Sequence, residues 1–151
     1  KRLSDTQKDE LRRKNVSIIF QDNNLLNDFT AIENIMMPLI ISGENLNLAS
    51  KKAKKLLEAV KISNRSNHFP NELSGGEQQR VAIARAIAMK PELILADEPT
   101  GNLDTENSIM IANILFKYVK EEGSSLIMVT HDPKLADKAK RKIKIKDGKI
   151  K

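Results

Sequence analysis

The sequence predicts an α/β domain with a mainly parallel sheet, because short apolar strands alternate along it with amphipathic helices. Three runs carry the strand prediction: 16–20 (VSIIF), 93–96 (LILA) and 125–129 (SLIMV). Continuous apolar runs of this length are typical of parallel strands that are buried on both faces. The stretch 22–90 is almost free of strand patterns, so we interpret it as a helical insertion. Residues 1–14 are polar and charged, and no element is predicted there.

Capping signals and helical periodicity predict the helices of the insertion. Thr30 and Glu33 have the spacing of a capping box and open a helix over 31–41, which Pro38 should kink or end. Apolar residues at helical spacing, beside a lysine-rich face, predict a second helix over 49–60. A polar loop separates it from a third helix.

The third helix is predicted over 74–89, where Ser74 and Glu77 form another capping box. After the strand 93–96, Asp104 can cap a long helix that ends at about Glu122, before a glycine suited to the C-terminal cap. Asp132-Pro133 then opens a short helix to about Lys140. The last element is an edge strand near Ile143 and Ile145, followed by an Asp-Gly turn.

Composition excludes several classes of protein. The chain has 151 residues, 40% hydrophobic and 30% charged, which is typical of one globular domain. The longest apolar run, 35–41, is far shorter than the about 20 residues of a membrane helix. The absence of cysteine excludes disulfide scaffolds, thiolate zinc sites and cysteine nucleophiles. With no secretion signal in the sequence, we expect a cytoplasmic location.

The formal net charge of +6 comes from the C-terminal end. Residues 134–151 contain nine basic and two acidic residues, so the remaining chain is almost neutral. We interpret the excess as a solvated lysine-rich face, with weak attraction to an anionic membrane surface as the alternative. No nucleic-acid partner is expected.

The strongest chemical signal is the octapeptide 73–80 (LSGGEQQR). A well-capped helix start does not explain Gly75 and Gly76, since glycine within a helix costs about 1 kcal/mol relative to alanine. Glycine is useful where a ligand approaches the backbone closely, and the free N–H groups of a helix start favour a phosphate. The Ser74 hydroxyl can add a further donor.

This octapeptide resembles the signature motif of the ATP-binding cassette (ABC) ATPases, and the rest of the chain contains four further motifs in the family's order. Gln21 is similar to the glutamine of the Q-loop, and 93–99 (LILADEP) resembles the Walker B strand followed by the catalytic glutamate. Residues 101–104 (GNLD) resemble the D-loop, and 130–132 (THD) the H-loop.

The resemblance covers essentially all of residues 1–151. It implies a P-loop NTPase (RecA-like) parallel-sheet core, formed by 1–21 and 91–151, with an ABC-type helical subdomain over 22–90. It also implies ATP and Mg²⁺ as cofactors.

The resemblance assigns catalytic roles to four residues. Glu98 is implied as the general base, and His131 as the contact to the terminal phosphate. Asp97 is implied to serve Mg²⁺, which would offset the cost of a carboxylate that ends a buried strand. Gln21 is implied to ligate the metal or to orient the attacking water.

The signature residues Ser74, Gly75, Gly76 and Glu77 are implied to bind nucleotide across a homodimer. In this family, two domains enclose ATP between the Walker A loop of one and the signature of the other. Asp104 is implied to communicate between the two nucleotide sites.

The Walker A loop, G-x-x-x-x-G-K-S/T, is absent from these 151 residues, since no two of the six glycines have its spacing. We therefore expect that the N-terminal part of an ABC nucleotide-binding domain has been lost. The 151-residue chain alone is expected to fold poorly and not to hydrolyse ATP.

The stretch 20–43 resembles the lipoprotein-releasing (LolD-type) branch, and we expect it to face transmembrane permease subunits on the cytoplasmic side of the inner membrane. The form ADEPTGNLD (96–104) is shared with MacB-type export and FtsE-type cell-division ATPases, which remain alternatives. An inactive truncated remnant is a further alternative. A chromosome-maintenance or DNA-repair ATPase is disfavoured, because only 52 residues separate Gln21 from Ser74 and they show no heptads.

Overall fold

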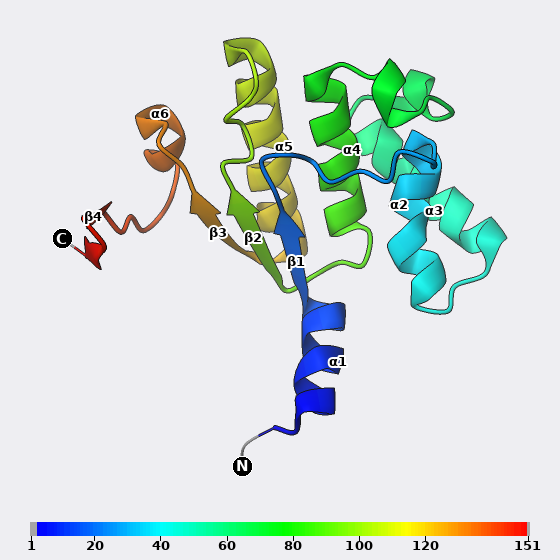
Figure 1. The fold of residues 1–151 in the computed structure, drawn as a ribbon, viewed down its shortest axis with the longest axis horizontal. Helices are drawn as coiled ribbons and strands as arrows, with labels where there is room; N and C mark the ends of the chain where they lie inside the picture. Colours follow the sequence, from blue (N-terminus) through cyan, green and yellow to red (C-terminus); the bar gives the residue numbers. More distant parts are fainter. Residues whose placement is uncertain (1–2, 151) are drawn as a thin grey trace.

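A three-stranded parallel sheet lies at the centre of the fold, in a computed structural model that describes residues 3–150. The strands are β1 (Val16–Ile19), β2 (Leu93–Asp97) and β3 (Ser125–Val129), in the spatial order β1-β2-β3. Both neighbouring pairs run parallel, so the predicted α/β class and parallel sheet are confirmed (Figure 1).

Two helices, α4 (Gly75–Ile87) and α5 (Thr105–Glu122), cover one face of this sheet (Figure 1). Ile19, Ile94 and Ala96 point to that side and pack with Ile111 and Leu115 of α5. Asp104 caps α5, and Gly123, with φ of 71°, ends it in the left-handed conformation, as the sequence predicts.

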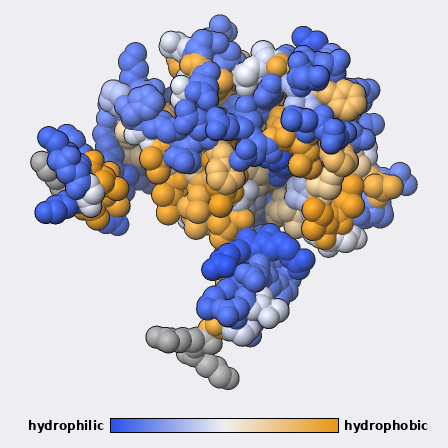
Figure 2. Space-filling view, viewed as in Figure 1, coloured by the Kyte–Doolittle hydropathy of each residue, from blue (hydrophilic) through white to orange (hydrophobic). Residues whose placement is uncertain are grey.

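The opposite face of the sheet is uncovered among residues 3–150. Ile18, Ile127 and Val129 are 49%, 58% and 59% exposed, and Figure 2 shows a hydrophobic patch over the strands. The prediction that the strands are buried on both faces is therefore wrong for the described chain. Side chains alternate along a strand, so only every second one reaches the helices.

The segment 22–90 contains no strand and folds as helices, as expected. Its helices α2 (Ala31–Ile41) and α3 (Leu46–Ala59) precede two short 3-10 turns, Ser63–Arg65 and Pro70–Glu72. The capping box of Thr30 and Glu33 is confirmed at the start of α2.

Pro38 lies inside α2, which continues to Ile41, so the proline does not end the helix. Ile35 and Leu39 are both fully buried in the core of the helical segment. Packing on either side of the proline therefore outweighs the backbone hydrogen bond that it removes.

Helix α4 contributes to two hydrophobic cores. Val81 and Ala84 pack with α2 and α3, whereas Ile83 and Ile87 pack with the sheet and α5. The helix is thus held between the helical segment and the sheet. It ends at Ile87, two residues before the predicted end.

Helix α1 (Asp5–Asn15) was not predicted from the sequence. A capping box of Ser4 and Gln7 starts it, and exposed ion pairs such as Lys14 with Glu10 lie along it. None of its residues is buried, and it projects away from the remaining fold (Figure 1). Its sequence has almost no apolar periodicity, which is the pattern that predicts an amphipathic helix.

The C-terminal segment differs from its prediction in two ways. Helix α6 (Pro133–Ala136) is shorter than expected, and β4 (Ile145–Lys146) pairs with β5 (Lys149–Ile150) rather than with the central sheet. The predicted Asp147-Gly148 turn joins them, with both residues at positive φ.

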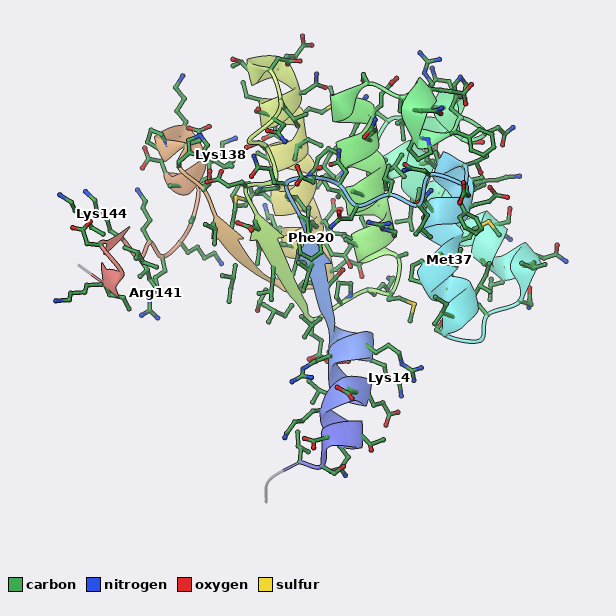
Figure 3. The ribbon with its side chains drawn as sticks, in the orientation of Figure 1. Lys14, Phe20, Met37, Lys138, Arg141 and Lys144 are labelled. Atoms are coloured by element: carbon green, nitrogen blue, oxygen red, sulfur yellow. The ribbon has the colours of Figure 1, made fainter. Side chains whose placement is uncertain are left out.

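The excess basic residues gather in this C-terminal segment. Figure 3 labels Lys138, Arg141 and Lys144 there, on the side of the molecule opposite Met37 of α2. Among residues 3–150, no helix has the length and apolar character needed to span a bilayer.

Candidate active site

The residues with predicted catalytic roles follow the carboxyl ends of the three parallel strands. Gln21 comes after β1, Asp97 ends β2 and Glu98 follows it, and His131 comes after β3. The register pairs Asp97 with Val129, so the ends of β2 and β3 lie at the same level. Parallel topology therefore brings these side chains to one edge of the sheet.

Glu98 and His131 are in direct contact, with 2.9 Å between Glu98 Oε1 and His131 Nδ1. A carboxylate only accepts hydrogen bonds, so Nδ1 carries the proton in this contact and leaves Nε2 free. The Glu98 side chain is 19% exposed, whereas that of His131 is 79% exposed. Glu98 Oε2 is buried and has no hydrogen-bond partner among the described residues.

The backbone of Glu98 is held in an unusual conformation. Its φ of 43° lies in the left-handed region, which is uncommon for a residue other than glycine. Its N–H donates to the Val129 carbonyl at 3.0 Å, and its carbonyl accepts from the N–H of Gly101 at 3.0 Å. These bonds fix the turn that presents the carboxylate.

Gln21 reaches the same turn from β1. Its Nε2 donates to Asn102 Oδ1 at 3.1 Å. A Cβ on Gly101 would lie 3.1 Å from that Nε2 and 3.4 Å from Glu98 Cβ, so the missing side chain at Gly101 lets Gln21 approach. Asn102 was part of the D-loop resemblance but was not predicted to contact Gln21.

Asp97 is exposed, which corrects the argument that its carboxylate is buried at a strand end. The uncovered face of the sheet accounts for this, because Asp97 alternates onto the side that carries Ile127 and Val129. Its carboxylate is thus accessible to a ligand at the same edge as Gln21.

A cleft of about 480 Å³ opens beside Glu98 and His131. The start of α5 and helix α6 form its walls, which carry both hydroxyl and ammonium groups: Thr100, Thr105, Ser108, Thr130, Lys134 and Lys138. The acidic Asp132 and the apolar residues Leu103 and Leu135 share this lining.

The signature motif forms the start of α4, as predicted. Glu77 N–H donates to Ser74 Oγ at 3.3 Å, and Ser74 N–H donates to Glu77 Oε2 at 2.8 Å. The Ser74 hydroxyl accepts in this capping box, and its own proton can go to the Glu77 carboxylate or to a ligand. The backbone hydrogen bond from Ser74 lowers the pKa of Glu77, with a smaller contribution from Arg65, whose Nε lies 3.1 Å from Glu77 Oε1.

The two glycines of the signature differ in their surroundings. A Cβ on Gly75 would meet only Leu103 Cδ2, at 3.9 Å, so this backbone is open. A Cβ on Gly76 would lie 2.6 Å from Asn107 Oδ1. The structure therefore gives Gly76 a packing reason within the chain, whereas close approach by a ligand is compatible with Gly75.

Asn107 also connects the signature helix to Asp104. Both its backbone N–H and its Nδ2 donate to the Asp104 carboxylate, at 2.8 and 2.7 Å. Arg80 Nη1 of α4 donates to Asn107 Oδ1 at 3.0 Å. The backbone hydrogen bond from Asn107 lowers the pKa of Asp104. The contact between Arg80 and Asn107 was not predicted, because it joins residues that are distant in sequence.

Comparisons with known proteins agree with this arrangement. A sequence model of the ABC transporter family matches residues 1–101. The chain is 50% identical to a "Macrolide export ATP-binding/permease protein MacB" of Campylobacter jejuni over 99% of its length, but spans only 23% of that protein. It is 49% identical to a "Lipoprotein-releasing system ATP-binding protein LolD" of Syntrophus aciditrophicus, over 92% of this chain and 62% of the relative.

The fold also matches a solved structure, the dimeric post-hydrolysis state of the ATP-binding cassette MJ0796 bound to ADP and Pi. The TM-score is 0.87 at 39% identity, over 98% of this chain and 66% of the other. The chain thus spans less than two thirds of each of these relatives. The family match, the relatives and the strand-end arrangement agree: this chain belongs to the ABC transporter family.

Proposed function

We propose that the protein carrying this chain is the ATP-hydrolysing subunit of an ABC transporter. The observation that carries the proposal is the contact between Glu98 and His131 at the carboxyl ends of the parallel strands. Glu98 Oε2 is buried without a hydrogen-bond partner among the described residues, so a water that enters the site beside it would meet an unpaired acceptor for its proton. The family membership supports the same reaction.

In this proposal, Glu98 polarises the water and accepts its proton, while His131 holds the carboxylate through Nδ1. His131 would contact the terminal phosphate through Nε2, which donates a hydrogen bond when both ring nitrogens carry a proton. The hydrogen bonds to the Val129 carbonyl and from the Gly101 N–H fix the Glu98 backbone, so the carboxylate is positioned before the substrate binds.

The residues at the sheet edge fit a magnesium ion held with nucleotide. Asp97 offers an exposed carboxylate, and Gln21 uses its amide nitrogen for Asn102, which leaves the amide oxygen for the metal. No group of three acidic, histidine or cysteine residues gathers within 3–150 to form a complete metal cage. Mg²⁺ commonly takes one or two protein oxygens and fills its shell with phosphates and water. When bound, it supplies positive charge beside the phosphates.

The start of α4 would bind the nucleotide of a second copy. Ser74 keeps a hydroxyl proton, and the first N–H groups of the helix, at Gly75 and Gly76, favour an anion. The dimeric state of the solved cassette supports a homodimer. Residues 1–151 lack the G-x-x-x-x-G-K-S/T loop, so this site needs that loop from outside the segment. Asp104 is bonded to Asn107, which lies against Gly76 of the signature, and is our candidate for communication between the two nucleotide sites.

Lipoprotein release from the inner membrane is our proposed process, with permease subunits contacted by residues 20–43. Phe29 and Ile41 of this stretch are exposed apolar residues, which suits a protein partner. MacB-type export is the second candidate, because the MacB relative is as similar as the LolD relative. Vesicles that contain the complete transporter would distinguish the two candidates. ATP-dependent release of lipoproteins would support the first, and ATP-dependent export of macrolides would support the second.

The hydrolysis proposal is tested with Glu98→Gln in the complete natural polypeptide that contains residues 1–151. We expect phosphate release to fall by about 100-fold or more, with ATP binding retained. Glu92→Gln is the matched control, because Glu92 is exposed and lies just before the same strand. Wild-type turnover that survives Glu98→Gln would overturn the proposal.

A further inference from the structure

The loop that follows Gln21 has no helix or strand over residues 23–30, yet parts of it adopt a constrained backbone. Asn23 and Asn24 both have positive φ, of 49° and 47°. Two successive left-handed residues other than glycine are unfavourable unless other contacts hold them. The contacts that hold this loop therefore matter for the placement of Gln21.

Arg85 of α4 provides such contacts. Its Nη1 donates to the Asn24 carbonyl at 2.7 Å, and its Nη2 donates to the Asn23 carbonyl at 2.9 Å. Arg85 is the only charged residue between Val81 and Met89. It is half-buried, and this burial lowers its pKa, although an arginine remains charged at neutral pH.

A structural role for a half-buried arginine usually involves a carboxylate, which would offset its charge. The hydrogen bonds of Arg85 instead go to two backbone carbonyls of one strained turn. A planar guanidinium can donate in parallel to two neighbouring acceptors, which a lysine cannot do. This geometry fixes the orientation of the turn directly after Gln21.

The far end of the loop is held independently by Asn34. Its Oδ1 accepts from Leu26 N–H at 2.8 Å, and its Nδ2 donates to the carbonyls of Leu26 and Phe29 at 3.1 and 2.9 Å. The loop thus has one anchor on α2 and one on α4. Loss of the Arg85 anchor should free residues 22–24 without unfolding the part held by Asn34.

Helix α4 connects this anchor to the signature motif. Arg85 lies ten residues after Gly75, or about 15 Å along the helix axis. The helix is buried on two sides, so it moves as one body. A displacement of the signature end would therefore displace the two carbonyls that follow Gln21.

We propose that Arg85 is a positioning residue that fixes the glutamine loop to the signature helix. Its two hydrogen bonds place Gln21 for the reaction and link that placement to the nucleotide-binding start of α4. The consequence for ATP turnover rests on the proposed function above. The anchoring of the loop does not.

The test compares Arg85→Met, Arg85→Lys and the exposed control Arg12→Met in the complete natural polypeptide. Hydrogen exchange reports on the amides of residues 22–24, with the amide of Leu26, which Asn34 holds, as the internal reference. We expect exchange there to be about tenfold faster in Arg85→Met, since two hydrogen bonds are lost, and intermediate in Arg85→Lys. Exchange in α2 should remain at the wild-type rate. Unchanged exchange of the loop in Arg85→Met would overturn the proposal.

Steady-state kinetics provide the second readout. We expect kcat of Arg85→Met to fall about tenfold with little change in KM, and partial recovery in Arg85→Lys, because the loss concerns placement of Gln21. If loop exchange is faster in Arg85→Met but its kcat equals that of the control Arg12→Met, the positioning role is overturned. Absence of turnover in the wild type would contradict the proposed function instead, and the exchange experiment would still decide the anchor.

Discussion

Asn107 of α5 occupies the space that a side chain at Gly76 of α4 would need. A Cβ on Gly76 would lie only 2.6 Å from Asn107 Oδ1. The Asn107 side chain cannot easily move away, because Arg80 holds its Oδ1 and Asp104 holds its Nδ2 through one hydrogen bond each. The second glycine of the signature thus sets the distance between the signature helix and the start of α5.

Substitution of Gly76 by alanine should destabilise the fold. The clash should cost about 1–3 kcal/mol, which exceeds the about 1 kcal/mol that alanine gains over glycine in a helix. Urea unfolding of the complete polypeptide measures this change. Gly75→Ala is the control and should not destabilise, because its Cβ meets only Leu103 at an ordinary contact distance. In an Asn107→Ala background, Gly76→Ala should cost nothing; additive losses would contradict this interpretation.

Asn34 should be among the most sensitive polar residues of the helical segment. It is fully buried and holds the loop before α2 through both the oxygen and the nitrogen of its side-chain amide. Asn34→Leu keeps a similar volume but leaves Leu26 N–H and the loop carbonyls without their partners. We expect a loss of about 2–5 kcal/mol in the free energy of unfolding. Asn45→Ala, which removes the exposed cap of α3, should cost only about 1 kcal/mol; equal losses would argue against the anchoring role of Asn34.

The capping box of the signature should contribute a stability that depends on pH. The backbone hydrogen bond from Ser74 lowers the pKa of Glu77 below its ordinary value of 4.5. This contribution is therefore fully present above pH 4.5 and is lost as the pH falls through the lowered pKa. The stability difference between wild type and Glu77→Gln should shrink over that range. Arg65→Gln should retain most of the pH dependence, since Arg65 is the smaller cause, and a difference independent of pH would contradict the prediction.

Substitution of two neighbouring residues of β3 by lysine should have opposite effects on the isolated 151-residue chain. Ile127 lies on the uncovered face of the sheet and is 58% exposed, whereas Met128 packs toward α4 and α5. Ile127→Lys should raise solubility with little loss of structure, and Met128→Lys should unfold the chain, as measured by sedimentation and circular dichroism. The isolated chain should show no ATP turnover. If both lysine variants keep or both lose their structure, the placement of Ile127 and Met128 on opposite faces of β3 is contradicted.

Local signals explain what could be predicted from the sequence. The capping boxes at Thr30 and Ser74, and the helix between Asp104 and Gly123, depend on residues a few positions apart, and the structure confirms them. The three strands were located for the same reason, because a short apolar run is visible without knowledge of its neighbours.

The errors concern features that depend on distant contacts or on the lack of an apolar pattern. The exposure of Asp97 follows from an uncovered sheet face, which no local pattern reports. Arg85 and Arg80 donate to partners in other elements, although a lone arginine in an apolar helix was a usable signal for Arg85. The roles of Gln21, Glu98 and His131 in catalysis stay predictions, since the structure shows their proximity and not their chemistry.

The pairing of Val16 with Leu93 across the whole helical segment has a consequence for how the chain folds. Contacts between residues so far apart in sequence close a large loop, which is slow and costs entropy before any packing offsets it. The helices between those strands depend mainly on nearby contacts, so we expect them to form early and to shorten the loop. β1 then joins β2 late, and the edge that carries Gln21 and Glu98 is assembled in the final steps of folding.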